Sequence, residues 1–154
     1  MNHKEGFKER TKVKIAEEKC SKYLIGKNIP HYDFGFDPYN KPIPKEEFYL
    51  LPEMARSAPD FIVFSKDFYF LEVKGCRDFL RLKTHDMKCY SIWNKMMSLW
   101  FFIYSSLKKR HQIISYRKLN DITKYCKVEV FENDNKEHYK IELEDIYGKS
   151  NIKK

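Results

Sequence analysis

Apolar and polar residues alternate along this chain with two periods, one typical of helices and one typical of strands. Apolar residues spaced three or four apart predict helices over residues 11–27, 85–97 and 119–125. Short apolar and aromatic runs, several of them alternating with a period of two, predict strands over residues 31–36, 60–64, 68–74, 99–104, 112–115, 127–131 and 138–143. Helices and strands are interspersed along the chain, so the pattern predicts an α/β fold.

The first predicted helix has one apolar face, on which Val13, Cys20 and Leu24 recur at helical spacing. At about 100° per residue, Glu17 lies between these residues, whereas Glu18 points well away from them. The helix is therefore expected to aim the carboxylate of Glu17 at the protein interior.

A single domain is the expected organisation, since 154 residues fall within the usual size of one folded unit. Residues 37–59 hold five of the six prolines and predict a loop-rich insertion, with one helical turn near residues 46–51. This insertion is either a substrate-facing loop or a disordered surface segment. Residues 77–84 predict a basic connector, and frayed ends are expected at residues 1–10 and 148–154.

The formal net charge of +8 at pH 7 favours polyanionic partners, with nucleic acid first among them. A lysine-rich composition without any such partner is the alternative. The chain has no apolar run of the roughly 18 to 20 residues that cross a bilayer, and its first ten residues lack the apolar core of a signal peptide. We therefore expect a cytoplasmic protein without a membrane segment.

The cysteines are dispersed along the chain, at Cys20, Cys76, Cys89 and Cys126. They form neither a CxxC pair nor a Cys/His cluster with the spacing of zinc ligands. We expect reduced thiols without a zinc site.

The clearest predicted hairpin places polar groups where a core strand would have apolar ones. If three residues make its turn, Phe64 pairs with Phe68. Counting back along both strands then sets Asp60 directly opposite Glu72. Opposed Cβ atoms lie about 4.5–5.5 Å apart, a distance at which like charges are destabilising unless a positive charge lies between them.

A divalent cation between Asp60 and Glu72 would supply that positive charge. Hard oxygen ligands and the scarcity of nearby His or Cys favour Mg²⁺ or Mn²⁺ over Zn²⁺. Lys74, two residues after Glu72, points to the same face of the strand. This group of side chains suits phosphodiester hydrolysis, in which Lys74 would orient or deprotonate the attacking water or stabilise the transition state.

The pair Pro59-Asp60, followed after eleven residues by Glu72-Val73-Lys74, resembles the motif of the PD-(D/E)xK nucleases. That family includes type II restriction endonucleases and Holliday-junction resolvases. The resemblance implies a restriction-endonuclease-like core, with a central mixed β-sheet flanked by helices, metal ligands on a hairpin, and often a glutamate from an N-terminal helix. The catalytic residues it implies are Lys74, Glu72, Asp60 and Glu17. The metal-site residues it implies are Asp60, Glu72, Val73 and Glu17.

The basic connector begins three residues after Lys74, so its positive charges are placed to contact phosphates beside the scissile bond. The predicted nucleic-acid-binding residues are Arg77, Arg81, Lys83 and Lys88. The alternative is a charged loop that serves only solubility.

The leading hypothesis is a Mg²⁺-dependent endonuclease that acts on DNA, with branched DNA and a symmetric homodimer both consistent with so short a chain. A second hypothesis is a basic nucleic-acid-binding protein of the same fold that does not cut, and a third is a nuclease acting on RNA. The plainest structural alternative is an ordinary hairpin with a surface ion pair between Glu72 and Lys74, which would contribute little to stability.

Overall fold

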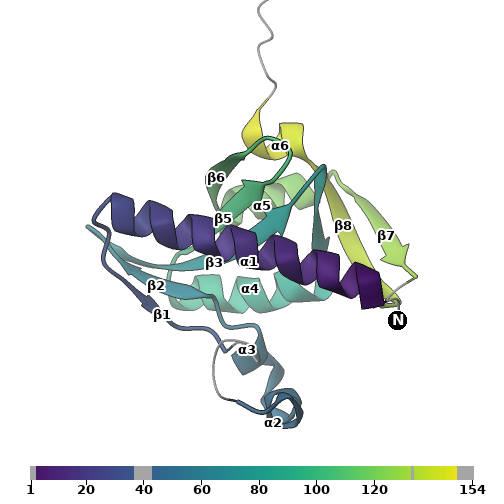
Figure 1. The fold of residues 1–154 in the computed structure, drawn as a ribbon, viewed down its shortest axis with the longest axis horizontal. Helices are drawn as coiled ribbons and strands as arrows, with labels where there is room; N and C mark the ends of the chain where they lie inside the picture. The colour runs from purple at the N-terminus through teal and green to yellow at the C-terminus, as the bar shows by residue number, and fades with distance from the viewer. Residues whose placement is uncertain (1–2, 37–42, 133, 149–154) are drawn as a thin grey trace, which may run out of the picture.

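The computed structural model describes residues 3–36, 43–132 and 134–148, which form two β-sheets with helices packed on them (Figure 1). The helices are α1 (His3–Gly26), α2 (Lys45–Leu50), α3 (Glu53–Arg56), α4 (Thr84–Met96), α5 (Tyr116–Thr123) and α6 (Leu143–Tyr147). The strands are β1 (His31–Asp33), β2 (Phe61–Phe64), β3 (Phe68–Cys76), β4 (Phe79–Lys83), β5 (Leu99–Ser105), β6 (Arg110–Ser115), β7 (Lys127–Phe131) and β8 (Lys136–Glu142).

The larger sheet has the strand order β1-β2-β3-β5-β6. β3 and β5 run parallel, and every other neighbouring pair in this sheet is antiparallel. Parallel strands need a crossover connection, which here includes β4 and α4. The predicted α/β fold with a central mixed sheet flanked by helices is confirmed.

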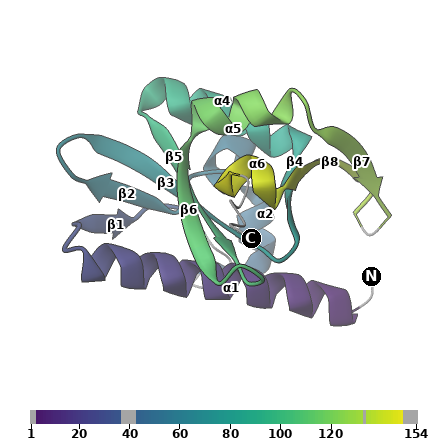
Figure 2. The ribbon, with the colours of Figure 1, turned by 90° about the horizontal axis from the view of Figure 1, so that it is seen from above.

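Helix α1 covers one face of the larger sheet, and α4 and α5 lie on the other (Figure 2). Under α1, the buried residues Ala16, Cys20 and Leu24 pack with Leu71 and Phe102 of the strands. This buried stripe begins one turn later than predicted, because Val13 is 45% exposed. The half-buried position of Glu17 and the exposed position of Glu18 agree with the predicted helix orientation.

On the opposite face, α4 packs its aromatic residues against the central strands. The Tyr90 ring lies edge-on to Phe101 of β5, with ring centroids 5.2 Å apart. Trp93 contacts Phe70 of β3 in the same way, with centroids 5.3 Å apart. Leu119 of α5 is completely buried in the same cluster. The two faces of the sheet therefore have separate apolar clusters, one on the α1 side and one on the α4 side.

The smaller sheet is antiparallel, with the order β4-β8-β7. The predicted closing hairpin of β7 and β8 is confirmed. The prediction of a connector over residues 77–84 is wrong, because residues 79–83 form β4. Leu80 and Leu82 are buried while Arg81 between them is exposed. This alternation is typical of a strand with one face in solvent. The charged residues on the solvent face made the segment resemble a loop in the sequence.

Other element boundaries also differ from the predictions. α1 begins at His3, so residues 3–10 are helical where a frayed end was expected. Residues 43–59 of the predicted insertion contain two short helices, α2 and α3, each preceded by a proline. Residues 37–42 and 149–154, which fall in the predicted insertion and the predicted frayed end, lie outside the described residues.

No helix among the described residues is both long enough and apolar enough to cross a bilayer. The four cysteines are all unpaired, as expected.

Gly75 sets how closely α1 approaches β3. A Cβ atom at this position would lie 2.4 Å from the carbonyl oxygen of Lys12 and 3.2 Å from the Cβ of Ala16. The helix backbone therefore packs directly on the strand, next to Lys74. Because a backbone carbonyl cannot rotate away as a side chain can, any larger residue here would force the helix to move.

We expect Gly75→Ala to destabilise the protein by about 1–3 kcal/mol or more, as is usual for overpacking. Urea unfolding followed by circular dichroism would measure the change. Gly26→Ala is the matched control, since a Cβ there meets nothing within 4 Å. Equal stability of the two variants would contradict this direct packing of α1 on β3.

Candidate active site

The hairpin of β2 and β3 has the register predicted from its sequence, with Phe64 paired to Phe68. The backbone pairing of the two strands ends at Phe61 and Leu71, so Asp60 lies just outside it. The side chain of Asp60 makes the next bond, because the amide of Val73 donates to Asp60 Oδ2 over 2.6 Å. The Asp60 carboxylate is thus held between the strands, beside the peptide group that joins Glu72 to Val73.

The main chain of Asp60 is fixed from the β1 side. The amides of Phe34 and Gly35 donate to the Asp60 carbonyl over 2.8 and 3.4 Å. A Cβ atom at Gly35 would lie 2.9 Å from the carbonyl oxygen of Pro59, so only glycine fits without a shift. Asp60 is therefore held through both its backbone and its side chain.

Glu72 lies on the α4 side of β3 and is only 7% exposed. Tyr90 donates a hydrogen bond from its hydroxyl to Glu72 Oε1 over 2.7 Å. The Lys74 Nζ atom is 2.8 Å from the same oxygen, and 5.4 Å from the centroid of the Tyr90 ring. The Glu72–Lys74 ion pair is therefore largely buried, unlike the exposed pair of the plainest structural alternative.

The charges of this cluster perturb one another strongly. Burial raises the pKa of Asp60 and the neighbouring Glu72 carboxylate raises it further, so that it stands well above its ordinary value despite Lys74. Burial alone would lower the pKa of Lys74, but Glu72 and Tyr90 bring it well above its ordinary value. Lys74 therefore stays a cation, and its charge only partly offsets the repulsion between the carboxylates.

Glu17 lies half-buried on α1, which packs on the other face of the sheet from α4 (Figure 2). Its negative charge adds to the rise in the pKa of Asp60. Burial raises the pKa of Cys20 to about 12, and the charges of Asp60 and Glu17 contribute to that rise. The charges of Glu17 and Asp60 therefore both influence the pKa of Cys20, which is buried under α1.

The residues present fit a hard divalent cation. Asp60 and Glu72 offer carboxylate oxygens, the donors that Mg²⁺ and Mn²⁺ prefer, and Glu17 on α1 is a candidate for a third. A cation among them would also relieve the repulsion that raises the pKa of Asp60. Val73 is 4% exposed with its side chain in the cluster under α1, so only its main-chain carbonyl oxygen could serve as a ligand.

Comparison with solved structures finds two nucleases of similar fold. One is Hjc, a Holliday junction resolvase from the archaeal hyperthermophile Archaeoglobus fulgidus, with a TM-score of 0.52 and 11% identity over 88% of each chain. The other is D212, a nuclease from a fusselovirus, with a TM-score of 0.50 and 12% identity over 92% of this chain and 85% of that one. Both are members of the PD-(D/E)xK superfamily. The chain has the restriction-endonuclease-like fold.

Neither a family model nor a curated protein sequence matches this chain. At 11–12% identity the structural likeness shows the fold alone, so the roles of individual residues rest on the geometry above.

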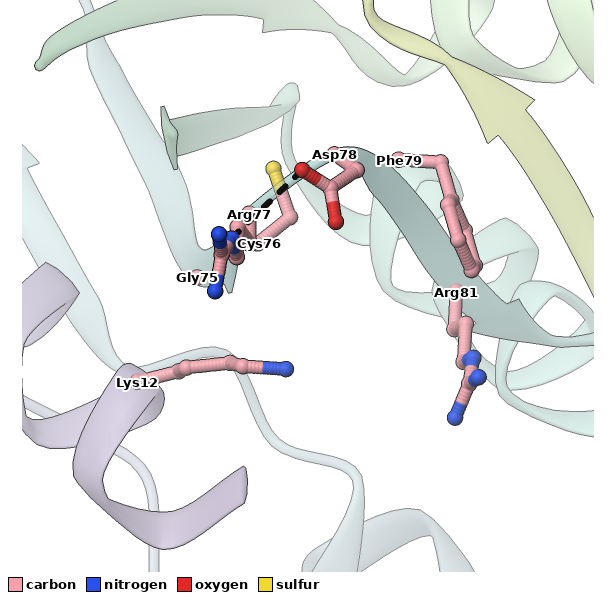
Figure 3. A pocket seen from close by; sticks show the side chains of 7 residues that line it. All are labelled: Lys12, Gly75, Cys76, Arg77, Asp78, Phe79 and Arg81. Atoms are coloured by element: carbon pink, nitrogen blue, oxygen red, sulfur yellow. Dashed lines mark ion pairs between the residues drawn. The ribbon is translucent and has the colours of Figure 1, made fainter. Parts of the chain in front are cut away.

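Within this restriction-endonuclease-like fold, a pocket of about 180 Å³ opens beyond the carboxyl end of β3 (Figure 3). Three cationic residues from separate segments line it: Lys12 of α1, Arg77 after β3, and Arg81 of β4. Asp78 also lines the pocket, with its Oδ1 atom 3.6 Å from Arg77 Nε. The residues that line the pocket carry a net positive charge, and one of them, Arg77, follows Lys74 by three residues.

Of the four predicted nucleic-acid-binding residues, the pocket brings together only two, Arg77 and Arg81. The guanidinium of Arg81 also stacks 3.7 Å from the centroid of the Phe131 ring. Lys83, at the end of β4, and Lys88, exposed on α4, do not line the pocket.

No motif or spacing in the sequence identifies Lys12, Tyr90 or Asp86 as site residues. Asp86 and Tyr90 are four apart on α4, and both raise the pKa of Lys74. Helical spacing over residues 85–97 marks Tyr90 only as an apolar contact of this helix. A buried tyrosine hydroxyl usually finds a hydrogen-bond partner, so its polar end was the available signal.

Tyr90 is a positioning residue, and its effect is expected to appear in the affinity for the cation. In Tyr90→Phe, the loss of the bond to Glu72 should weaken Mg²⁺ binding about 10–100-fold, as for other hydrogen bonds that orient a ligating carboxylate. Isothermal titration with Mg²⁺ measures this directly. Tyr125→Phe is the control, since Tyr125 is 90% exposed. Equal Mg²⁺ affinities in the two variants would show that Tyr90 only packs.

Proposed function

We propose that this protein is a Mg²⁺-dependent nuclease that hydrolyses phosphodiester bonds in DNA and acts as an endonuclease. One observation supports this above all others. The Asp60 carboxylate accepts a bond from the Val73 amide, the charge of Glu72 raises the pKa of Asp60, and the Lys74 ammonium lies 2.8 Å from Glu72 Oε1. The likeness in fold to two nucleases, one of them a Holliday junction resolvase, is consistent with this chemistry.

In this proposal Asp60 and Glu72 hold the cation, with Glu17 as a third carboxylate. A divalent ion bound there supplies Lewis-acid stabilisation of the phosphoryl charge and lowers the pKa of water. Lys74 places a second positive charge at the same face, where it stabilises the charge that develops on the phosphate oxygens. Tyr90 and Lys74 share one oxygen of Glu72 and so orient that carboxylate.

The basic pocket is the proposed binding site for the DNA backbone. Arg77 follows Lys74 by three residues, which along a strand is roughly 10 Å. Lys12, Arg77 and Arg81 would therefore contact phosphates flanking the scissile bond rather than the reacting one. Such contacts fix the position of the nucleic acid without reading its sequence.

A substrate panel tests the proposal. Supercoiled DNA, linear duplex, a four-way DNA junction and single-stranded RNA would each be incubated with the protein and Mg²⁺, Mn²⁺ or EDTA. We expect metal-dependent cutting of DNA, with closed circular molecules cleaved because an endonuclease needs no end. Cutting of RNA alone would replace DNA as the substrate. Failure to cut any substrate at stoichiometric enzyme would reject the nuclease activity and leave a binding protein.

A further inference from the structure

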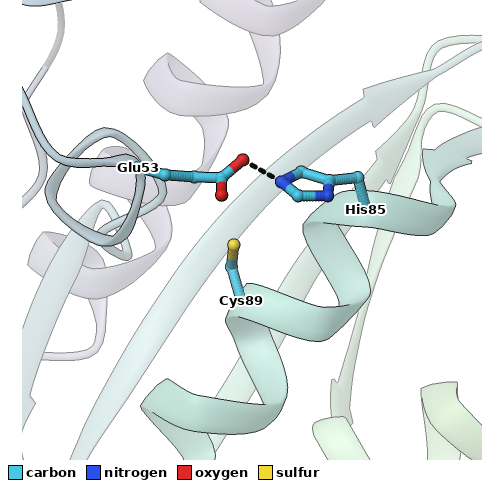
Figure 4. Close-up of side chains that lie close together, drawn as sticks. All are labelled: Glu53, His85 and Cys89. Carbon is cyan, nitrogen blue, oxygen red and sulfur yellow. Dashed lines mark hydrogen bonds and ion pairs between the residues drawn. The ribbon is translucent and has the colours of Figure 1, made fainter. Parts of the chain in front are cut away.

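A second group of metal-ligating side chains lies outside the proposed nuclease centre. Glu53, His85 and Cys89 each offer one ligand atom, and these atoms all lie within 4.8 Å of one another. Figure 4 shows the three side chains converging, with Glu53 reaching across from α3 toward the two residues of α4. His85 Nε2 is hydrogen-bonded to Glu53 Oε1.

The fold assembles this group from two elements far apart in sequence. His85 and Cys89 are four residues apart, so they occupy one face of α4. Glu53 is the first residue of α3 and is 32 positions from His85. The spacing of the cysteines and histidines in the sequence predicts no zinc site. This group differs from that prediction because its third member, Glu53, comes from the predicted insertion.

An ion pair alone does not explain the arrangement. His85 and Glu53 each have 53% of the side chain exposed, and exposed pairs of this kind contribute little to stability. Cys89, in contrast, is only 5% exposed and has its sulfur directed at the pair. A thiol in that place adds nothing to a His–Glu bond, but it completes a set of nitrogen, oxygen and sulfur donors.

We propose that Glu53, His85 and Cys89 bind one Zn²⁺ ion, or a similar borderline transition metal. Thiolate, imidazole and carboxylate are the usual zinc ligands, and three of them leave one tetrahedral position for water. Sulfur and nitrogen donors disfavour Mg²⁺, so the ion would differ from that of the Asp60–Glu72 site. Binding releases the thiol proton of Cys89 to solvent.

A metal at this site would fasten the α3 segment to α4. The residue after Cys89 is Tyr90, which bonds Glu72 of the other site. The ion would therefore stabilise the helix that orients the proposed catalytic carboxylate, without touching it. This inference does not rest on the proposed nuclease function, because its test detects sulfur ligation and not cleavage.

Titration of the metal-free protein with Co²⁺ under anaerobic conditions tests the site. We expect one equivalent to give a thiolate-to-cobalt charge-transfer absorption, which Zn²⁺ abolishes and excess Mg²⁺ does not. Co²⁺ bound among Asp60, Glu72 and Glu17 would have only oxygen ligands and give no such band. Glu72→Gln should therefore retain it.

Three variants complete the test. Cys89→Ser should lose the band, and His85→Ala, at an exposed position that does not endanger folding, should bind Co²⁺ at least about tenfold more weakly. Cys126→Ser, which replaces a half-buried cysteine elsewhere, is the matched control and should bind as the unaltered protein does. Absence of the band in the unaltered protein, its persistence in Cys89→Ser, or unchanged affinity in His85→Ala would overturn the proposal.

Discussion

Replacement of Lys74 with alanine is expected to slow DNA cleavage by about 10²–10³-fold while leaving DNA affinity largely unchanged. The Lys74 ammonium lies 2.8 Å from Glu72 Oε1, at the face where Asp60 and Glu72 would hold the cation. Removing the ammonium takes away a positive charge that would stabilise the negative charge on the phosphate oxygens in the transition state. Single-turnover cleavage rates and a separate binding assay in Ca²⁺ would distinguish the two effects.

Lys95→Ala is the matched control for this experiment, since Lys95 is an exposed lysine on α4. The Lys74 variant leaves Glu72 buried, with Tyr90 as its remaining partner among residues 3–36, 43–132 and 134–148, so a lower Tm is expected as well. Cleavage should therefore be compared at a temperature at which circular dichroism shows both variants to be folded. Full cleavage by the folded Lys74 variant would show that the ion pair is merely structural.

Asp60→Asn is expected to abolish cleavage and yet raise the Tm of the metal-free protein. The asparagine oxygen can still accept the bond from the Val73 amide, but the repulsion from Glu72 is lost. For a chain of this length, each kcal/mol of relieved repulsion raises the Tm by roughly 2–4 °C. The further rise in Tm that Mg²⁺ gives the unaltered protein should disappear in the variant.

The raised pKa of Asp60 should also make the stability of the metal-free protein depend on pH. The pKa of Asp60 is raised in the folded state, so the folded protein binds more protons than the unfolded chain between the two values. The free energy of unfolding of the metal-free protein should therefore increase as pH falls through the raised pKa of Asp60. Asp60→Asn should remove this increase. Asp67→Asn, an exposed turn residue of the same hairpin, is the control. At a pH above the raised pKa of Asp60, a lower Tm for the Asp60 variant than for the Asp67 variant would contradict the account of the charges.

The hairpin could be predicted from the sequence because its information is local. A three-residue turn sets Phe64 opposite Phe68, and the alternation of side chains then determines which residues share a face with Glu72. The helix period likewise distinguished Glu17 from Glu18. These inferences need only the spacing of residues within one element or across one short turn.

The remaining parts of the site depend on contacts between elements distant in sequence. Lys12 lines the basic pocket because Gly75 lets the α1 backbone approach β3 closely. The spacing of residues in the sequence does not predict this close approach. Tyr90 bonds Glu72 only after the crossover places α4 over the sheet. Glu53 bonds His85 only because the fold places the start of α3 near the start of α4. Long-range packing of this kind is set by the whole core, which sequence periodicity does not specify.

The most direct test of the central claim is a crystal of the protein soaked in Mn²⁺ and measured at the manganese absorption edge. We expect an anomalous density peak within coordination distance of carboxylate oxygens of both Asp60 and Glu72, with Lys74 at its side. A map without manganese between these two carboxylates, at a concentration that saturates cleavage, would contradict the proposed site.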